Sequence, residues 1–170
     1  MLRPNSYEAA DGKHNGCGEE AGIMKAKEGV AMKISLLDRS LYYKSLMLLI
    51  RKDREIRDEE KNMMMNIGKM LGFNPAFCAN TIEEIMDNNY IIDAPPLFSE
   101  ANIALCFIRD GLRLSAADGQ IHEAEMTWLK SVAESNGLGN LWAGELEKFY
   151  LVYRAEIPEN SLELSSFKWE

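Results

Sequence analysis

The sequence has no apolar stretch long enough to cross a bilayer; near its start the longest such run is only Leu46 to Ile50. Nor does it have a disulfide framework, because its three cysteines are odd in number and far apart. The amino terminus lacks the hydrophobic segment that is typical of signal peptides. We therefore expect a cytoplasmic protein that is not inserted into a membrane.

Positive charge is scarce as well, with 19 Lys and Arg against 27 Asp and Glu and a formal net charge of −8. A negative protein repels phosphate backbones, so we do not expect nucleic acid as a partner. The hydrophobic fraction of 46% and the charged fraction of 27% are typical of a folded globular domain. A chain of 170 residues is long enough for one such domain with a substantial core.

The motifs of common enzymes are missing too. The sequence contains no nucleophile elbow, no phosphate-binding glycine loop, no H-E-x-x-H and no convincing Ser/Cys–His–Asp set. His14 and Cys17 have a spacing that a metal could use, but no second ligand pair follows, and we interpret this spacing as accidental. We therefore expect a protein that is not an enzyme.

Helical patterning dominates the chain after a glycine-punctuated leader. We expect a flexible extension over residues 1–31, a helical domain over 32–157 and a tail over 158–170. Apolar residues at three- and four-residue steps, with Gly, Asn-Pro and Ser at the boundaries, predict the helices. An interruption near Asn80 is expected because Thr81 and Glu84 form a capping-box pattern, and Ser99 is expected to cap a long helix. The expected helices are 35–52, 58–71, a third from Pro75, 99–117, 123–136 and 141–154. The predicted fold is an all-α, compact bundle of about six to seven helices.

An internal repeat is the most informative feature of the sequence. The pattern D-x-x-I-x-[D/E]-x-E occurs from Asp53 to Glu60 and again from Asp118 to Glu125, at an offset of 65 residues. The same offset superposes Gly72 on Gly137 and several apolar core positions on one another. We interpret the repeat as two pseudo-symmetric helix–corner–helix units.

The acidic residues of the repeat allow two interpretations. In the structural one, Glu60 and Glu125 occupy the third position of a helix, where a carboxylate accepts hydrogen bonds from free backbone N–H groups. In the functional one, the two corners lie side by side and their carboxylates converge on one another. Oxygen donors of this kind suit Ca²⁺, Mg²⁺ or Mn²⁺, and nearby Arg side chains are the alternative source of positive charge. The candidate metal ligands are Asp53, Glu60, Asp118 and Glu125.

The pattern does not fit an EF-hand. Counted from Asp118, the sixth position holds Glu123 instead of Gly and the twelfth holds Leu129 instead of Glu. His122 lies inside the second acidic motif, where it is either a further ligand or an exposed residue at the start of a helix.

The second copy, Ala-Ala-Asp118-Gly119-x-Ile-x-x-x-Glu125 followed by an apolar helix that closes at Asn-Gly-Leu, resembles the signature of the TerB-like tellurite-resistance family. It is also similar to the N-terminal domain of membrane-anchored DnaJ-like co-chaperones. The first copy is similar as well, with Arg54 where the family has Gly. The resemblance implies an all-helical fold with internal pseudo-symmetry and a role in stress or tellurite resistance through protein complexes. It also implies a divalent-cation site at the four repeat carboxylates.

Two functions therefore remain open, and a third, a hydrolase that uses the carboxylate cluster with a metal, is only distantly supported. The first is a non-enzymatic TerB-like protein that binds a divalent cation through its paired acidic corners and acts through protein partners. The alternative is a metal-free helical interaction or co-chaperone-like module, in which the acidic corners serve only as helix caps.

Overall fold

A computed structural model describes residues 32–153 and 162–169 of the chain. Internal contacts divide the chain into Met1–Val30 and Ala31–Glu170, and every described residue belongs to the second unit. The expected flexible leader, with its His14 and Cys17, lies outside the described residues. The elements run, in order, β1 (Met32–Ile34), α1 (Leu36–Ile50), α2 (Asp58–Met70), α3 (Pro75–Glu84), α4 (Ala101–Ser115), α5 (Glu123–Ser135), α6 (Trp142–Tyr153), the 3₁₀ helix η1 (Glu163–Ser166) and β2 (Phe167–Trp169).

These elements confirm the prediction of an all-α bundle. Several helix boundaries follow from local sequence. Ser35 caps α1 by accepting a hydrogen bond from the N–H of Asp38, and Asn74 caps α3 through the N–H of Ala76 with Pro75 in the first turn. The chain leaves α2 and α5 through Gly72 and Gly137, whose φ values of 74° and 73° are readily adopted only by glycine.

The two copies of the repeat have the same structure. Helix α1 begins and ends 65 residues before α4, and α2 begins and ends 65 residues before α5. The corner between each pair of helices contains one residue with positive φ, Arg54 at 68° and Gly119 at 80°, again at the same offset. The repeat in the sequence is therefore a repeat of backbone conformation.

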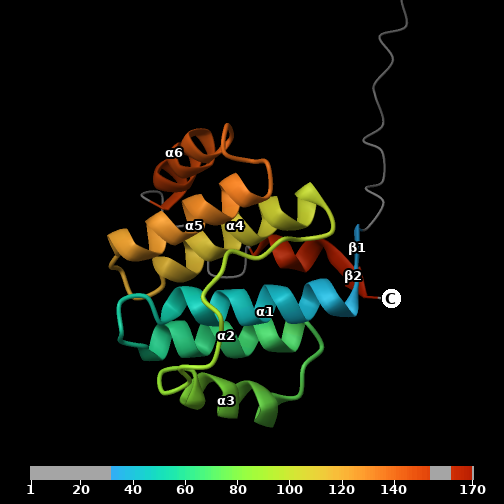
Figure 1. Ribbon diagram of the computed structural model, residues 1–170, viewed down its shortest axis with the longest axis vertical. Coiled ribbons are helices and arrows are strands. Elements are labelled where there is room, and N and C mark those ends of the chain that lie inside the picture. Colours follow the sequence, from blue (N-terminus) through green and yellow to red (C-terminus); the bar gives the residue numbers. More distant parts are fainter. Residues whose placement is uncertain (1–31, 154–161, 170) are drawn as a thin grey trace, which may run out of the picture. The chain divides into compact units, whose positions relative to one another are not determined.

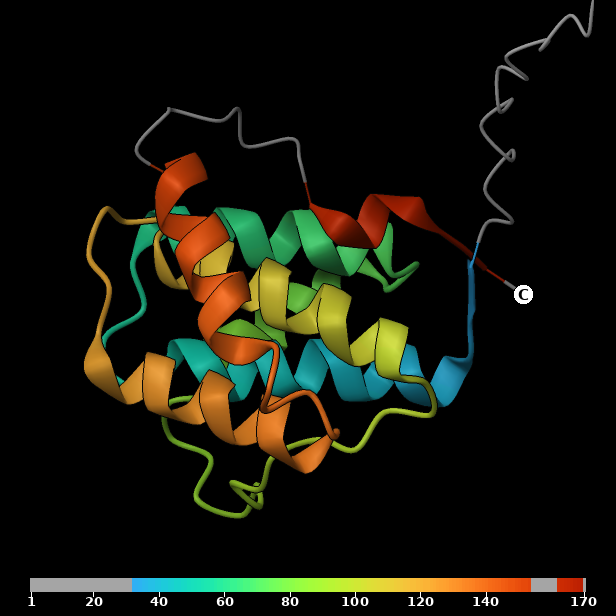
Figure 2. The same cartoon turned by 90° about the horizontal axis from the view of Figure 1, so that it is seen from above.

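Helix α4 is the centre of the bundle. It contacts α1, α2, α5, α6 and η1, and it carries the fully buried ring of Phe107. Figure 1 shows the first copy with α3 in the lower half of the molecule and the second copy with α6 in the upper half. The two corner loops lie at the same end of the bundle, on the left in Figures 1 and 2. This placement brings the two acidic motifs close together.

Three details differ from the predictions. Helix α3 runs without interruption, because the Thr81 hydroxyl donates to the carbonyl of Phe77 inside the helix and does not cap a new one. Ser99 is not the N-cap of α4, a position that Glu100 occupies; the Ser99 hydroxyl and N–H donate instead to Asp38 of α1. The short parallel pair of β1 and β2 was not predicted, since three residues are too few for a strand pattern.

The carboxyl-terminal segment packs onto the helices. Its side chains Leu162, Leu164 and Phe167 are buried, and β2 pairs with β1 in the register Met32 with Phe167 and Ile34 with Trp169. The described part of the expected tail over 158–170 is therefore continuous with the core of the bundle.

Candidate functional site

Each corner is built by the same short-range hydrogen bond. Asp53 Oδ1 accepts from the N–H of Glu55 at 3.0 Å, and Asp118 Oδ1 accepts from the N–H of Gln120 at 2.8 Å. An aspartate that bonds to the backbone two residues later stabilises a tight turn. One oxygen of each aspartate therefore shapes the corner, and the other oxygen is directed elsewhere.

The two glutamates cap the helices that follow the corners. Glu60 Oε2 accepts from the N–H of Arg57 at 2.9 Å, and Glu125 Oε2 accepts from the N–H of His122 at 3.3 Å. Both residues are buried, with exposed fractions of 3% and 1%. The structural interpretation of these glutamates is correct as far as one oxygen of each is concerned.

The two corners are joined by reciprocal contacts. Arg57 Nη1 of the first copy lies 3.2 Å from Asp118 Oδ2 of the second, and His122 Nε2 of the second lies 3.3 Å from Asp53 Oδ2 of the first. Arg57 and His122 occupy equivalent positions of the repeat, as do the two aspartates. The pseudo-symmetry thus places the N-cap residue of each copy against the aspartate of the other. The imidazole contributes an ion pair only when it is protonated.

Burial and acidic neighbours raise the pKa values of both glutamates. Burial raises the pKa of Glu60 to about 7; the hydrogen bond from Arg57 opposes this increase, and the charges of Asp53 and Asp118 add to it. Burial likewise raises the pKa of Glu125 to about 8, with further contributions from Glu60 and Asp53. All four predicted carboxylates therefore belong to one interacting group, contributed by both copies of the repeat.

The chemistry of this group suits a hard divalent cation, whereas the placement of its side chains does not provide a finished coordination sphere. In residues 32–153 and 162–169, no three His, Cys, Asp or Glu side chains are positioned together to hold a metal ion. Arg57 and His122 stand where a cation would approach Asp118 and Asp53. A cation bound here would have to replace these two side chains as the partners of the aspartates.

Three buried acidic residues outside the corners were not predicted: Asp38, Asp110 and Glu145. Asp110 accepts hydrogen bonds from the Tyr42 hydroxyl and from the N–H groups of Glu163 and Leu164, at 2.7–3.0 Å. Arg109 holds Glu145 through two hydrogen bonds of 2.7 and 3.2 Å and lowers the pKa of Glu145 to about 2. Asp110 anchors the carboxyl-terminal segment, Glu145 joins α6 to α4, and Asp38 holds Ser99 against the start of α1. An aspartate on the apolar face of α4 was the available signal.

Comparison with protein-family models, with curated proteins and with solved structures found no match to this chain. Over the described ranges, none of the helices combines the length and the apolar character that a bilayer crossing requires. The interpretation of the site therefore depends on its own geometry.

Proposed function

We propose that this chain is a non-enzymatic, cytoplasmic helical module of the TerB-like kind, which binds a divalent cation through its paired acidic corners. The cation would be Ca²⁺, Mg²⁺ or Mn²⁺, and the module would act through protein partners in a stress response such as tellurite resistance. The observation that supports this proposal is the convergence of four carboxylates from two repeats at one end of the bundle.

Electrostatics gives the reason to expect a cation there. Glu60 and Glu125 are buried beside acidic neighbours that raise their pKa values to about 7 and 8. When both glutamates ionise, the group needs more positive charge than Arg57 supplies. The caps engage only Oε2 of each glutamate, so Oε1 is not committed to the helix end. Asp53 and Asp118 would complete the set of oxygen ligands.

A second candidate is the metal-free module, and the reciprocal pairs favour it. Each of the four acids already has a protein partner: the glutamates cap α2 and α5, and the aspartates face His122 and Arg57. In this case the corners only hold the two repeats of the chain together, and the function resides in the surface of the bundle, as in an adaptor or co-chaperone.

Thermal unfolding of the full-length protein separates the two candidates. After chelation, the protein is titrated with Ca²⁺, Mg²⁺ and Mn²⁺ at a pH of about 8, where the glutamates ionise most readily. Cation binding to the folded state would raise the melting temperature saturably, and the Glu60→Gln/Glu125→Gln double variant would abolish this increase. Asp58→Asn is the matched control, because Asp58 is an acid in the first turn of α2 whose side chain is 91% exposed.

The opposite result has a defined meaning. If no ion shifts the melting temperature at millimolar concentration, or if Asp58→Asn removes the shift as completely as the double variant does, the cation site is refuted. The metal-free module then remains.

A further inference from the structure

One continuous part of the chain carries negative charge without any positive charge of its own. Between Lys69 and Arg109 the sequence contains no Lys, Arg or His. This stretch includes α3, the long connection that leads from α3 to α4, and the first half of α4. It contains five acidic residues, all exposed: Glu83, Glu84, Asp87, Asp93 and Glu100.

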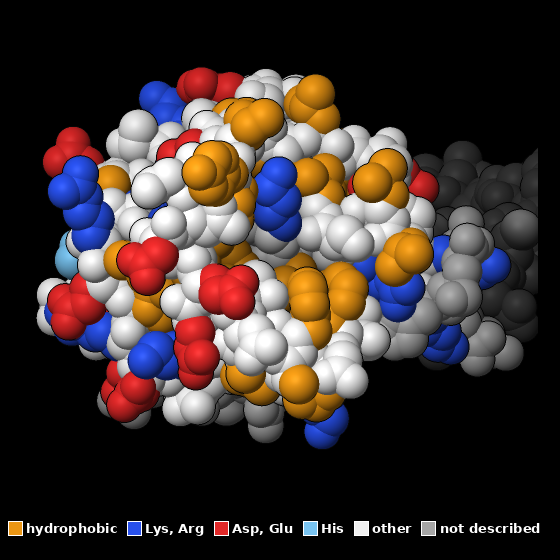
Figure 3. Space-filling view, turned by 60° about the horizontal axis from the view of Figure 1, so that its bottom comes forward, with side chains coloured by type: hydrophobic (Ala, Val, Ile, Leu, Met, Phe, Trp, Pro, Cys, Tyr) orange, Lys and Arg blue, Asp and Glu red, His pale blue; other side chains and the backbone are white. Residues whose placement is uncertain are grey.

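The same stretch exposes large apolar side chains. Tyr90 is 96% exposed and Ile92 75%, and they lie between Asp87 and Asp93 in the sequence. Large exposed apolar side chains that form one patch often mark an interaction site, whereas single exposed apolar residues are ordinary. Figure 3 views the molecule with α3 turned forward, and hydrophobic, acidic and basic side chains are intermixed on this side. We refer to the exposed apolar and acidic residues of α3 and of the connection that follows it as the acidic–apolar face: Phe77, Glu83, Glu84, Met86, Asp87, Tyr90, Ile92, Asp93 and Leu97.

Neighbouring elements neutralise only part of this charge. Lys52, at the end of α1, pairs with Asp93, and Arg51 donates to the carbonyls of Ile85 and Asn88. Among the described residues, no Lys, Arg or His lies within ion-pair distance of the other acids of the face. Two of these acids, Glu83 and Glu84, lie in the last turn of α3, where the helix dipole is also negative.

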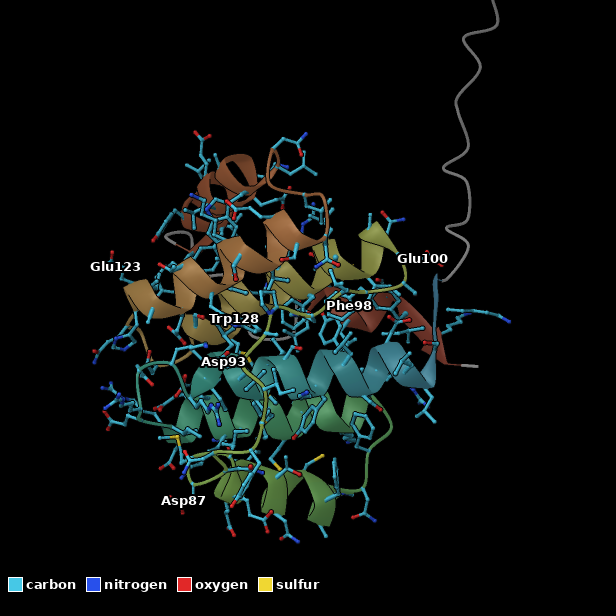
Figure 4. All side chains as sticks on the ribbon, viewed as in Figure 1. Asp87, Asp93, Phe98, Glu100, Glu123 and Trp128 are labelled. Carbon is cyan, nitrogen blue, oxygen red and sulfur yellow. The ribbon has the colours of Figure 1, made fainter. Side chains whose placement is uncertain are left out.

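A shallow groove adjoins this face. Its volume is about 560 Å³, and it is lined by Lys52 and by one side of α5 from Glu123 to Ser131. Lys52 connects the two surfaces, since it pairs with Asp93 and lies 5.4 Å from the ring centre of Trp128. Figure 4 labels Asp93 and Trp128, the two residues that Lys52 joins. Trp128 lies in the wall of the groove and is 93% buried. Its indole nitrogen has no hydrogen-bond acceptor among the described residues.

We infer that the acidic–apolar face binds a basic amphipathic segment of a partner protein. Apolar side chains of the segment pack on Tyr90 and Ile92, and its Lys or Arg side chains face the unpaired carboxylates of Glu84 and Asp87, which precede them in the chain. A second copy of this chain is a poorer occupant, because its net charge of −8 would bring acid against acid. The inference deepens the partner-binding part of the proposed function and does not depend on the cation site.

The test uses the full-length protein and a fluorescent amphipathic helix made of Lys and Leu. Two control peptides replace Lys by Glu or Leu by Ser. We expect saturable binding of the Lys–Leu peptide that weakens with added salt, and no binding of either control. Tyr90→Ser with Ile92→Ser should weaken binding at least about tenfold, because both side chains are exposed and contribute contact area only when a partner is present.

The charge of the face is tested by a second pair of changes. Glu84→Gln with Asp87→Asn should weaken binding about tenfold and reduce its salt dependence. The matched controls lie elsewhere on the molecule: Leu151→Ser on α6, at 66% exposure, and Asp58→Asn on α2. Both controls should bind the peptide as the unaltered protein does, and thermal unfolding confirms that each variant is folded.

Three results would overturn the inference. The first is equal weakening by the face variants and the controls, which indicates attraction to net charge alone. The second is equal binding of the Glu–Leu peptide. The third is self-association, measured by sedimentation, that the Tyr90 and Ile92 variant abolishes, which would identify a second copy as the occupant. The Glu60→Gln/Glu125→Gln variant should keep full peptide binding, so a failed cation titration and a failed peptide titration remain distinguishable.

Discussion

The pH dependence of stability tests the electrostatics of the corners through one substitution, Glu125→Gln. Burial, together with Glu60 and Asp53, raises the pKa of Glu125 to about 8, whereas in the unfolded chain this carboxyl has its ordinary pKa of 4.5. Between these two values the folded state holds a proton that the unfolded state has released. Stability must therefore fall as the pH rises through this interval, because the folded state binds more protons.

The size of the effect follows from the shift. At 1.36 kcal/mol per pKa unit, Glu125 alone should lower the free energy of unfolding by about 2 kcal/mol between about pH 6 and pH 8. Glu60, with a pKa of about 7, adds about 1 kcal/mol over the same interval. Burial also raises the pKa of Asp110, to about 6, so its contribution falls mostly below this window. Gln accepts the same capping hydrogen bond but does not titrate.

The assay is urea unfolding at several pH values between about 6 and 8, for the full-length protein and for Glu125→Gln. Between these pH values, the decrease in the free energy of unfolding should be about two thirds smaller for the variant than for the unaltered protein. The test compares slopes against pH, so it does not depend on the stability of the variant at any single pH. Glu59→Gln, an exposed acid in the first turn of α2, should leave the slope unchanged. If Glu125→Gln retains the full slope, Glu125 is ionised in the folded protein and the argument from burial is refuted.

Three further predictions concern single sites away from the glutamates. Arg54→Gly should raise the free energy of unfolding by about 0.5–1 kcal/mol, measured by thermal or urea unfolding, because glycine adopts the φ of 68° without steric cost. Asp110→Ala should lower it by about 2–4 kcal/mol and accelerate amide hydrogen exchange at Glu163, whose N–H loses its acceptor. Gly111→Ala should lower it by about 1–3 kcal/mol in urea unfolding, because the added Cβ would lie 2.6 Å from Leu129 Cδ2.

The helices were predictable because their signals are local. Apolar spacing, the glycines after α2 and α5, and the Asn74–Pro75 start of α3 operate within a few residues, and tertiary contacts did not override them. The repeat was predictable because corresponding residues recur at one offset in the sequence. The structure extends this correspondence to the backbone, with a positive φ at both Arg54 and Gly119.

Two incorrect predictions arose where another contact replaced the expected cap, a distant one for Ser99 and one within the same helix for Thr81. Ser99 has the right residue type for a cap, but Asp38, which is 61 positions earlier in the chain, takes both its hydroxyl and its N–H. Thr81 has the right spacing from Glu84, but it lies inside a helix that already extends from Pro75. For Ser99 the outcome is decided by which elements pack together, and this information is not present in a window of sequence.

The candidate site was predictable only where its contacts are local in the sequence. The capping role of Glu60 and Glu125 is a contact between residues three positions apart. The pairing of Arg57 with Asp118 joins the two copies, so a residue that looks like a counter-charge for its own motif serves the other motif. Asp110 was overlooked because its partners, Tyr42 and the carboxyl-terminal segment, are more than 50 residues away in either direction.

The reciprocal pairs also determine how protons and cations relate at this site. Arg57 always carries a positive charge, whereas the equivalent His122 carries one only when protonated, so the two halves of the site are unequal. Ionising Glu60 and Glu125 adds negative charge that Arg57 alone does not balance, and either protons or a divalent cation must supply the difference. Protons and cations therefore compete for the same carboxylates. Cation stabilisation should grow as the pH rises above about 7, over the same interval in which the cation-free protein loses stability.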